Sequence, residues 1–224
     1  MKKRLYAVIA TVALLVAIMA GCAAAPAENN EEPATPPEIA DIGNAKSVIL
    51  VKSYENTADL SFMAVNEQGF WEEVLSTKQA WVGKNGVTNH KQEGDGCTPA
   101  GVYTLSTPFG VKDAPEGKLW EDYIKLTEDE YWVDDGESKY YNTLVRKSEA
   151  DETWESAEHL VEEDVAYAYA CNIDYNTQCI PGNGSAIFLH CSSGRPTGGC
   201  VSVPEDVMIQ LLQLINDDTV IVIQ

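Results

Sequence analysis

The 224-residue chain is poor in positive charge. It has 15 Lys and Arg residues against 35 Asp and Glu residues, which gives a formal net charge of −20. So acidic a protein repels a phosphate backbone, and we expect no nucleic-acid partner. Arginine is especially scarce, because the chain holds only Arg4, Arg146 and Arg195. An arginine beside a candidate site is therefore informative.

Long hydrophobic runs are also scarce, and the one at the N-terminus is short. Residues 2–4 are basic, and the apolar run that follows, residues 5–20, is 16 residues long. This length is short for a membrane-spanning helix but suits the core of a signal peptide. The run ends in Met-Ala-Gly-Cys22, which resembles the lipobox of bacterial lipoproteins.

The lipobox resemblance implies that residues 1–21 are a signal peptide and that Cys22 carries the lipid anchor. We then expect an exported protein, lipid-anchored to the outer face of the cell membrane. The alternative is an ordinary signal peptide that is cleaved near Ala25. Residues 22–45 are rich in Pro, Ala and Glu without apolar periodicity, so we predict a disordered tether there. The folded domain is expected to span residues 46–224.

Within this domain the apolar pattern indicates mostly strands. Strands are predicted at 47–51, 60–64, 101–105, 165–173, 187–189, 201–203 and 219–223, and a hairpin turn at 66–69. One helix is expected after Pro204, because Glu205 and Asp206 suit its first turn and apolar residues follow at helical spacing. The fold class is therefore mainly β with α, an α+β domain with a C-terminal helix and strand.

The usual metal-site motifs are missing. The chain has no Cys-x-x-Cys pair and no EF-hand pattern, so we expect neither a metal nor a cofactor. A zinc site made of His190, Cys191 and Cys200 is the alternative. Four cysteines, Cys97, Cys171, Cys179 and Cys191, allow three disulfide pairings, and Cys171 and Cys179 flank a predicted turn.

The candidate chemistry lies in residues 185–204. A predicted buried strand ends at His190, a Gly/Ser/Pro loop follows, and Gly198 and Gly199 precede Cys200. A cysteine nucleophile needs a nearby base, which His190 would supply. The glycines let a carbonyl substrate approach the backbone, and the N–H groups of Gly199 and Cys200 would face the developing oxyanion. The alternative is a buried structural thiol beside a histidine.

This segment resembles the catalytic signature of the L,D-transpeptidases, the YkuD-type family. His190 precedes Thr-Gly-Gly-Cys200-Val after a nine-residue gap, and upstream the stretch from Thr98 to Tyr103 is similar to the family's Thr-Pro-x-Gly-x-aromatic strand entry. The family's histidine before Gly-Cys is replaced by Gly198, and its arginine two places after the cysteine by Ser202. The resemblance implies a β-sandwich-type catalytic domain with Cys200 as nucleophile and His190 as base.

Further residues near the candidate site are expected either to bind substrate or to be structural. We predict that Arg195, Gly198 and Ser193 bind substrate, and Arg195 would grip a carboxylate unless it is a solvated loop residue. His90 is expected on a surface loop and His159 in a structural or exposed position. The acidic stretch from 111 to 164 is expected to be mostly a solvated face, with residues 132–135 as a candidate wall of the cleft.

The resemblance implies a peptidoglycan L,D-transpeptidase that cross-links stem peptides through a thioester and acts as a monomer. One alternative is an L,D-carboxypeptidase or another cell-wall peptide hydrolase with the same Cys/His site. The other is a non-catalytic wall-binding lipoprotein, which the glycine at 198 makes conceivable.

Overall fold

The computed structural model describes residues 42–117 and 119–224, and all of them belong to one compact unit. The predicted signal peptide, Cys22 and all but the last four residues of the predicted tether lie outside the described residues. Within the described ranges, no helix has the length and apolar character needed to cross a membrane.

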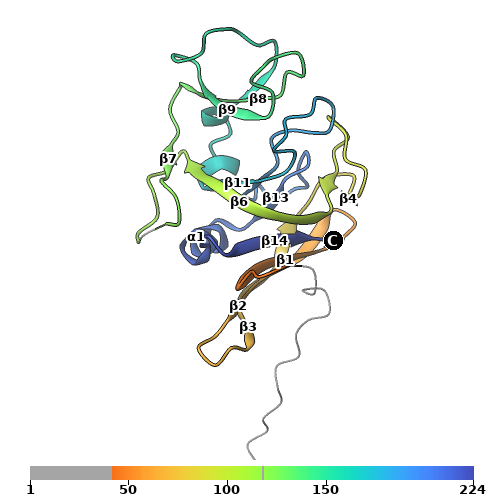
Figure 1. Ribbon diagram of the computed structural model, residues 1–224, viewed down its shortest axis with the longest axis vertical. Coiled ribbons are helices and arrows are strands. Elements are labelled where there is room, and N and C mark those ends of the chain that lie inside the picture. Colours follow the sequence, from red (N-terminus) through yellow and green to blue (C-terminus); the bar gives the residue numbers. More distant parts are fainter. Residues whose placement is uncertain (1–41, 118) are drawn as a thin grey trace, which may run out of the picture. The chain divides into compact units, whose positions relative to one another are not determined.

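Strands dominate the described residues, and one α-helix lies near the C-terminus (Figure 1). In chain order the elements are β1 (Ser47–Tyr54), β2 (Thr57–Val65), β3 (Trp71–Trp81), β4 (Val87–Thr88), β5 (Thr98–Pro99), β6 (Gly101–Gly110), β7 (Ile124–Lys125), β8 (Glu130–Val133), β9 (Thr143–Arg146), β10 (Ala157–His159), the 3-10 helices η2 (Leu160–Glu162) and η3 (Ala166–Ala168), β11 (Ala170–Ile173), β12 (Phe188–Cys191), β13 (Val201–Val203), α1 (Glu205–Leu214) and β14 (Thr219–Ile223).

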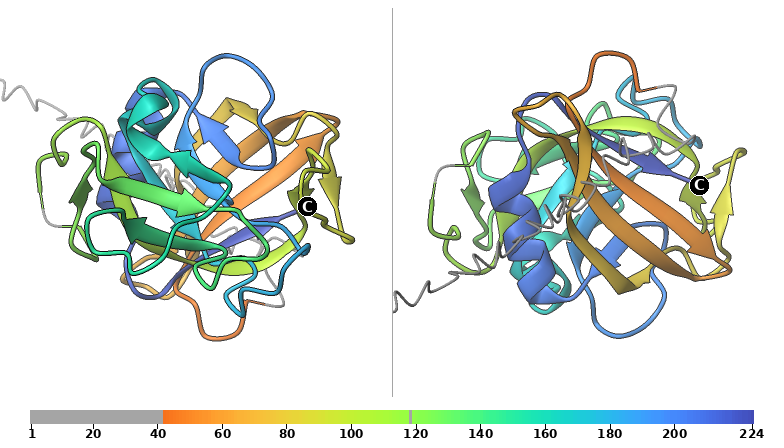
Figure 2. Two further views of the ribbon diagram at one scale, coloured as in Figure 1. Left: turned by 90° about the horizontal axis from the view of Figure 1, so that it is seen from above. Right: turned by 90° about the horizontal axis from the view of Figure 1, so that it is seen from below.

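The main sheet has nine strands in the order β11-β12-β13-β3-β2-β1-β14-β6-β7. Strand β11 pairs with β6 as well as with β12, so the pairings link eight strands in a closed circuit. These strands can be followed in the two views of Figure 2. Most neighbours are antiparallel, but three pairs run parallel: β12 with β13, β1 with β14, and β6 with β7.

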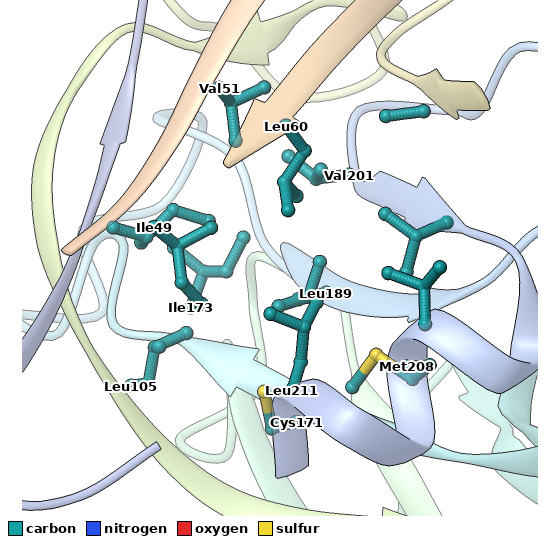
Figure 3. Close-up of a cluster of buried hydrophobic side chains, with 14 of the residues drawn as sticks. Ile49, Val51, Leu60, Leu105, Cys171, Ile173, Leu189, Val201, Met208 and Leu211 are labelled. Carbon is teal, nitrogen blue, oxygen red and sulfur yellow. The ribbon is translucent and has the colours of Figure 1, made fainter. Parts of the chain in front are cut away.

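The main core consists of apolar side chains from the main sheet together with the buried face of α1. Ile49 and Leu60 from neighbouring strands meet Leu189 of β12 and Met208 and Leu211 of α1 (Figure 3). All five side chains are fully buried. Removal of such area from water is worth about 25 cal/mol per Å², so this cluster fixes β12 and β13 firmly in place.

A second core cluster contains residues from the other side of β12. Phe188 contacts the rings of Phe109, Trp132 and Tyr167 edge to face, with centroids 4.9–5.5 Å away. Trp132 belongs to a small three-stranded sheet with the order β10-β8-β9, and Tyr167 belongs to η3. These aromatic contacts hold the small sheet and η3 against β12 and β13.

The structure confirms the mainly β class with a C-terminal helix and strand, and it corrects three details. The predicted strand at 165–173 begins only at Ala170, because residues 166–168 form η3. The small sheet was not predicted, since its strands are only three or four residues long and lie within the acidic stretch. Strand β3 is also longer than the hairpin signal indicated.

Candidate active site

The register of β12 and β13 brings the two predicted catalytic residues to one side of the sheet. His190 is aligned with Ser202, and Cys200 lies two residues before Ser202. Side chains alternate along a strand, so Phe188, His190, Cys200 and Ser202 share a face. Core membership agrees, because Phe188 and Cys200 belong to the second cluster, while Leu189 and Val201 belong to the main core.

The connection between His190 and Cys200 is held by the segment that follows β3. Thr197 N–H donates to the carbonyl of Val82 at 3.0 Å, and its own carbonyl accepts from Lys84 N–H at 2.9 Å. At its start, Ser192 N–H donates to the carbonyl of Val203 at 2.7 Å. These backbone bonds fix both ends of a glycine-rich loop, so the position of Cys200 is determined by the surrounding sheet.

The thiol of Cys200 is buried and bonded to the backbone. Its Sγ donates to the carbonyl of Ala186 at 3.3 Å and accepts from Phe188 N–H at 3.3 Å. Burial raises the pKa of the thiol to about 12, and the nearby negative charge of Glu158 acts in the same direction. The Phe188 hydrogen bond and the charge of Lys91 oppose this shift. Cys200 is therefore a neutral thiol at pH 7 in the resting protein.

His190 is also neutral at rest. Its Nδ1 donates to the carbonyl of Cys191 at 2.8 Å, which leaves the lone pair of the neutral ring on Nε2. Burial lowers the pKa of His190 to about 4, although backbone hydrogen bonding at Cys191 and Ala166 favours the charged form. The ring of Tyr167 packs edge-on against it at 5.5 Å. This environment suits a base that accepts a proton only when the reaction supplies one.

No hydrogen bond joins Cys200 and His190 in the described part of the chain, because each bonds to backbone instead. The sequence predicts an imidazole that favours the thiolate. In the resting structure, burial instead shifts the pKa of each group towards its neutral form, and the thiol donates to the Ala186 carbonyl. The physical reason is desolvation, which disfavours both charged forms in a buried site.

Two threonines hold the backbone of Cys200. Its carbonyl accepts from Thr197 Oγ1 at 2.7 Å and from Thr98 Oγ1 at 3.1 Å. Thr98 is fully buried and accepts in turn from Gly83 N–H at 2.8 Å. The sequence analysis used Thr98 only as part of a strand-entry motif. Its positioning role could not be seen from the sequence, because the contact spans 102 residues of chain.

The predicted oxyanion donor Gly199 is already engaged in the resting structure. Its N–H donates to Thr197 Oγ1 at 3.1 Å. Gly199 has φ +157°, and an added Cβ would lie 3.0 Å from the carbonyl oxygen of Cys97. Glycine is therefore required here by close approach of two backbones. The oxyanion role assigned to Gly199 requires its N–H to exchange partners when substrate arrives.

A cavity of about 770 Å³ opens beside the thiol. Cys200, His190, Ser193, Arg195, Gly198 and Gly199 all line it, so the structure brings every predicted site residue of this segment together. The Arg195 side chain is exposed and makes no ion pair among the described residues. Its guanidinium is thus available to a substrate carboxylate.

The remaining histidines lie elsewhere. His90 is exposed and is not part of the cavity lining. His159 stacks on Tyr131 with ring centroids 4.3 Å apart, and its Nδ1 lies 3.0 Å from Glu162 Oε1. Both positions agree with the sequence analysis, which placed His90 on a surface loop and His159 in a structural or exposed position.

The five cysteines in the described residues are all free, including Cys171 and Cys179. Cys191 donates to the carbonyl of Tyr169 at 3.4 Å and packs in the main core, on the opposite face of β12 from His190. It therefore does not share a ligand set with Cys200. Within the described ranges, no three His, Cys, Asp or Glu side chains are grouped so that they could hold a metal ion.

Comparison with known proteins gives a family match that covers most of the chain. The YkuD family profile, described as an L,D-transpeptidase catalytic domain, matches residues 56–223. No curated protein sequence matches the chain.

Among solved structures, similarity is found to the helical cell shape determining protein Pgp2 from Campylobacter jejuni. It is 14% identical, with a TM-score of 0.44, and 84% of this chain and 54% of that chain are covered. A lysine-to-alanine mutant of the same protein gives 14% identity, a TM-score of 0.42, and coverage of 81% and 48%. The chain thus spans about half the length of these structures.

Proposed function

Because the chain belongs to the YkuD family of L,D-transpeptidase catalytic domains, we propose that it cross-links peptidoglycan stem peptides through a thioester on Cys200. The observation that carries this proposal is the placement of Cys200 and His190 on one face of two parallel strands, at a cavity that Arg195 also lines. Within the β-sandwich-type fold that the family resemblance implies, such a cleft would admit an extended peptide. The substrate class comes from the family.

In the proposed reaction, the Cys200 side chain leaves the Ala186 carbonyl and its proton passes to Nε2 of His190. The sulfur attacks the carbonyl of an L-centre residue that is joined to a terminal D-amino acid. The N–H groups of Gly199 and Cys200 stabilise the oxyanion. Collapse breaks the peptide bond, His190 returns the proton to the leaving amine, and a thioester remains.

In the second half of the reaction, the amine of another stem peptide attacks the thioester. The new amide bond forms as the carbon–sulfur bond breaks, and the proton lost by the amine returns to the Cys200 sulfur through His190. Arg195, with Ser193 and Gly198 beside it, would hold a carboxylate of the substrate during both steps. No cofactor takes part in this scheme.

Intact-mass spectrometry tests the proposal. After incubation with a disaccharide-tetrapeptide, we expect the protein to gain the mass of the donor minus its terminal D-amino acid. Cys200→Ala should abolish the adduct, whereas Cys97→Ala, the matched control at a partly buried thiol outside the cavity lining, should retain it. The absence of any adduct on the wild-type protein would contradict the proposal.

Two alternatives give different products. If water resolves the thioester even when an amine acceptor is present, the protein is a carboxypeptidase or related hydrolase. A non-catalytic wall-binding role is favoured by the resting site itself, since the thiol is neutral and bonded to the Ala186 carbonyl. Failure of Cys200 to form an adduct with a carbapenem-type β-lactam, combined with binding to peptidoglycan, would support that role.

We also propose that the protein acts as a monomer, exported and held at the outer face of the cell membrane by a lipid on Cys22. The support is the sequence pattern of residues 1–22, a basic head, a 16-residue apolar run and a Met-Ala-Gly-Cys junction. A chain with net charge −20 gains nothing from an anionic membrane surface, so its attachment requires a covalent lipid.

A further inference from the structure

One wall of the active-site cavity is acidic and lacks cations of its own. Asp134, which follows β8, Glu158 in β10 and Glu163 after η2 all line the cavity. None of the three forms an ion pair with a described Lys, Arg or His residue. We call Asp134, Glu158 and Glu163 the acidic wall. Burial of its carboxyl group raises the pKa of Glu158 to about 7, the hydrogen bond from Tyr167 opposes the shift, and the negative charges of Asp134 and Glu163 add to it.

The wall is a rigid part of the site. Glu158 Oε2 accepts a 2.5 Å hydrogen bond from the hydroxyl of Tyr167, whose ring packs against His190. Backbone pairing of β10 with β8 aligns Glu158 with Trp132, two residues before Asp134. The carboxyl group of Glu158 is therefore tied to the catalytic residues through Tyr167 and the second core cluster, and strand pairing places Asp134 at the end of the neighbouring strand.

Two polar atoms of the cavity lining lack a hydrogen-bond partner. Oδ1 of Asp134 is buried without a donor, and so is Oγ of Ser202, a residue that is only 1% exposed. Ser202 lies beside His190 in the register of β12 and β13. Buried polar atoms are normally satisfied, so these atoms indicate a ligand that brings hydrogen-bond donors.

The chemistry of the wall selects the class of ligand. Carboxylates favour a cation, and unpartnered acceptor oxygens favour one with several N–H groups. A primary ammonium group supplies one positive charge and three donors. Arg195, which also lines the cavity, favours the opposite charge. A peptide that carries both an amine and a carboxylate would satisfy both ends.

We propose that Asp134 and Glu158 form a subsite for a protonated primary amine of the peptide substrate, with the Ser202 hydroxyl as a further polar contact. This proposal rests on the proposed function, because it names the substrate chemistry of the same cavity. The amine belongs either to the side chain of the donor peptide or to the acceptor, and the experiment distinguishes these two sources.

Occupation of the subsite has a consequence for the nucleophile. The charge of Glu158 disfavours the thiolate of Cys200. An ammonium group bound to Glu158 neutralises that charge, so the thiolate becomes easier to form when the correct substrate is present. The charge of Glu158 thus opposes formation of the Cys200 thiolate when the subsite is empty, and this effect is removed when an ammonium group occupies the subsite.

The donor arm compares two tetrapeptides that differ only at the residue before the terminal D-alanine. One carries L-lysine with a free side-chain amine, and the other carries the same lysine with the amine acetylated. If the donor supplies the amine, the wild-type protein should form its acyl-enzyme with the free-amine peptide with a kcat/KM roughly 10- to 100-fold higher. Glu158→Gln, which keeps an acceptor for Tyr167, should lose this preference, as should Asp134→Asn.

Glu137→Gln is the matched control, because Glu137 is exposed and lies outside the cavity lining. It should behave as wild type. The acceptor arm starts from acyl-enzyme formed with the acetylated donor and measures how fast a free-amine peptide and water resolve it. A Glu158-dependent preference seen only in this arm assigns the subsite to the acceptor. If the preference for the free amine is the same in wild type and Glu158→Gln in both the donor arm and the acceptor arm, the proposal is overturned.

Failure of the proposed function gives a different result. If neither donor acylates the wild-type protein, alkylation of Cys200 by iodoacetamide is measured with and without the free-amine peptide as a ligand. A change in rate that appears in wild type and Glu137→Gln but not in Glu158→Gln supports the subsite without transpeptidation. No change with saturating free-amine peptide rejects the subsite as well.

Discussion

At the residue scale, the reactivity of Cys200 depends on desolvation more than on its neighbours. Its thiol and the imidazole of His190 are both neutral in the empty site, because burial disfavours each charged form. Proton transfer then has to accompany attack on the substrate instead of preceding it. Such a resting state protects a buried thiol from unwanted reactions and makes reaction depend on what occupies the cavity.

This arrangement predicts slow alkylation of the empty protein. The rate of iodoacetamide labelling at Cys200 should rise with pH through an inflection above the range of about 8.5 that is usual for a free cysteine. Glu158→Gln should move the inflection down, because it removes a negative charge that opposes the thiolate. Mass mapping separates Cys200 from Cys97 and Cys179, which are more exposed. An inflection below about 8.5 would contradict this prediction and would indicate that Cys200 and His190 form a thiolate–imidazolium pair in the empty site.

The threonine at 98 is predicted to act through position. Thr98→Val keeps the shape but removes the hydroxyl that links Gly83 N–H to the Cys200 carbonyl. A buried N–H left without a partner costs about 1–3 kcal/mol. We expect a lower free energy of unfolding in urea and a lower kcat. Thr98→Ser should recover kcat, because it restores the hydroxyl. A Val variant with wild-type kcat would show that Cys200 needs no such support.

At the residue scale the sequence indicated the nucleophile and base but not their supports. Cys200 and His190 lie ten residues apart in a segment whose glycines and buried strand have a clear pattern. Thr98 and Glu158 reach the site from 102 and 42 residues before Cys200, across strand pairings that no local pattern encodes. For Asp134 the sequence predicts a place in a candidate cleft wall and a solvated or capping carboxylate, whereas one of its oxygens is buried and unpartnered.

At the element scale, the loop between β12 and β13 has two neighbouring glycines with different constraints. An added Cβ at Gly198 would meet nothing within 4 Å, and its φ lies outside the region that favours glycine. At Gly199 the same atom would lie 3.0 Å from the Cys97 carbonyl and 3.3 Å from Ile187 Cδ1. There is therefore room for a side chain at Gly198, which replaces the family's histidine, but not at Gly199.

Alanine at these two positions should separate their roles. Gly198→Ala is expected to fold with wild-type stability, whereas Gly199→Ala should lose about 1–3 kcal/mol because the backbone has to shift. Chemical denaturation measures both values, and acyl-enzyme formation should fall further for Gly199→Ala than for Gly198→Ala. Equal stability of the two variants would mean that the loop relaxes freely and that it does not hold Cys200 in place.

The elements themselves were predicted unequally. Strands β1, β12 and β14 are predictable from the sequence because their residues are almost continuously apolar. This pattern arises because both faces of each strand are largely buried. The strands of the small sheet are only three or four residues long, and the sheet is held by the aromatic contact of Trp132 with Phe188 of the second cluster. That contact is tertiary, so short strands in an acidic stretch gave no signal of their own.

At the scale of the whole molecule, the distribution of negative charge is not explained by the stability of the fold. The chain has a net charge of −20, and part of the acidic excess lines the active-site cavity instead of the outer surface. Lys84, Lys91 and Arg195 also line this cavity, but none of them forms an ion pair with Asp134, Glu158 or Glu163. Carboxylates that are not ion-paired cost stability, since like charges repel in a partly desolvated space. Their retention is consistent with a cationic group on the substrate, which relieves the repulsion when it binds.

The same acidity makes the proposed attachment to the membrane testable as a property of the whole chain. Cys22→Ala removes the lipid acceptor, so the protein should move from the membrane fraction to soluble or precursor forms. A high-salt wash should not release the wild-type protein from the membrane, because a covalent lipid is insensitive to ionic strength. Attachment by charge would be lost, since charge interactions are screened within about 10 Å at 0.1 M salt. Cys179→Ala is the control, since a free cysteine in the folded domain should not affect fractionation. Unchanged membrane association of Cys22→Ala, together with an unmodified N-terminal mass in the wild type, would contradict lipid anchoring.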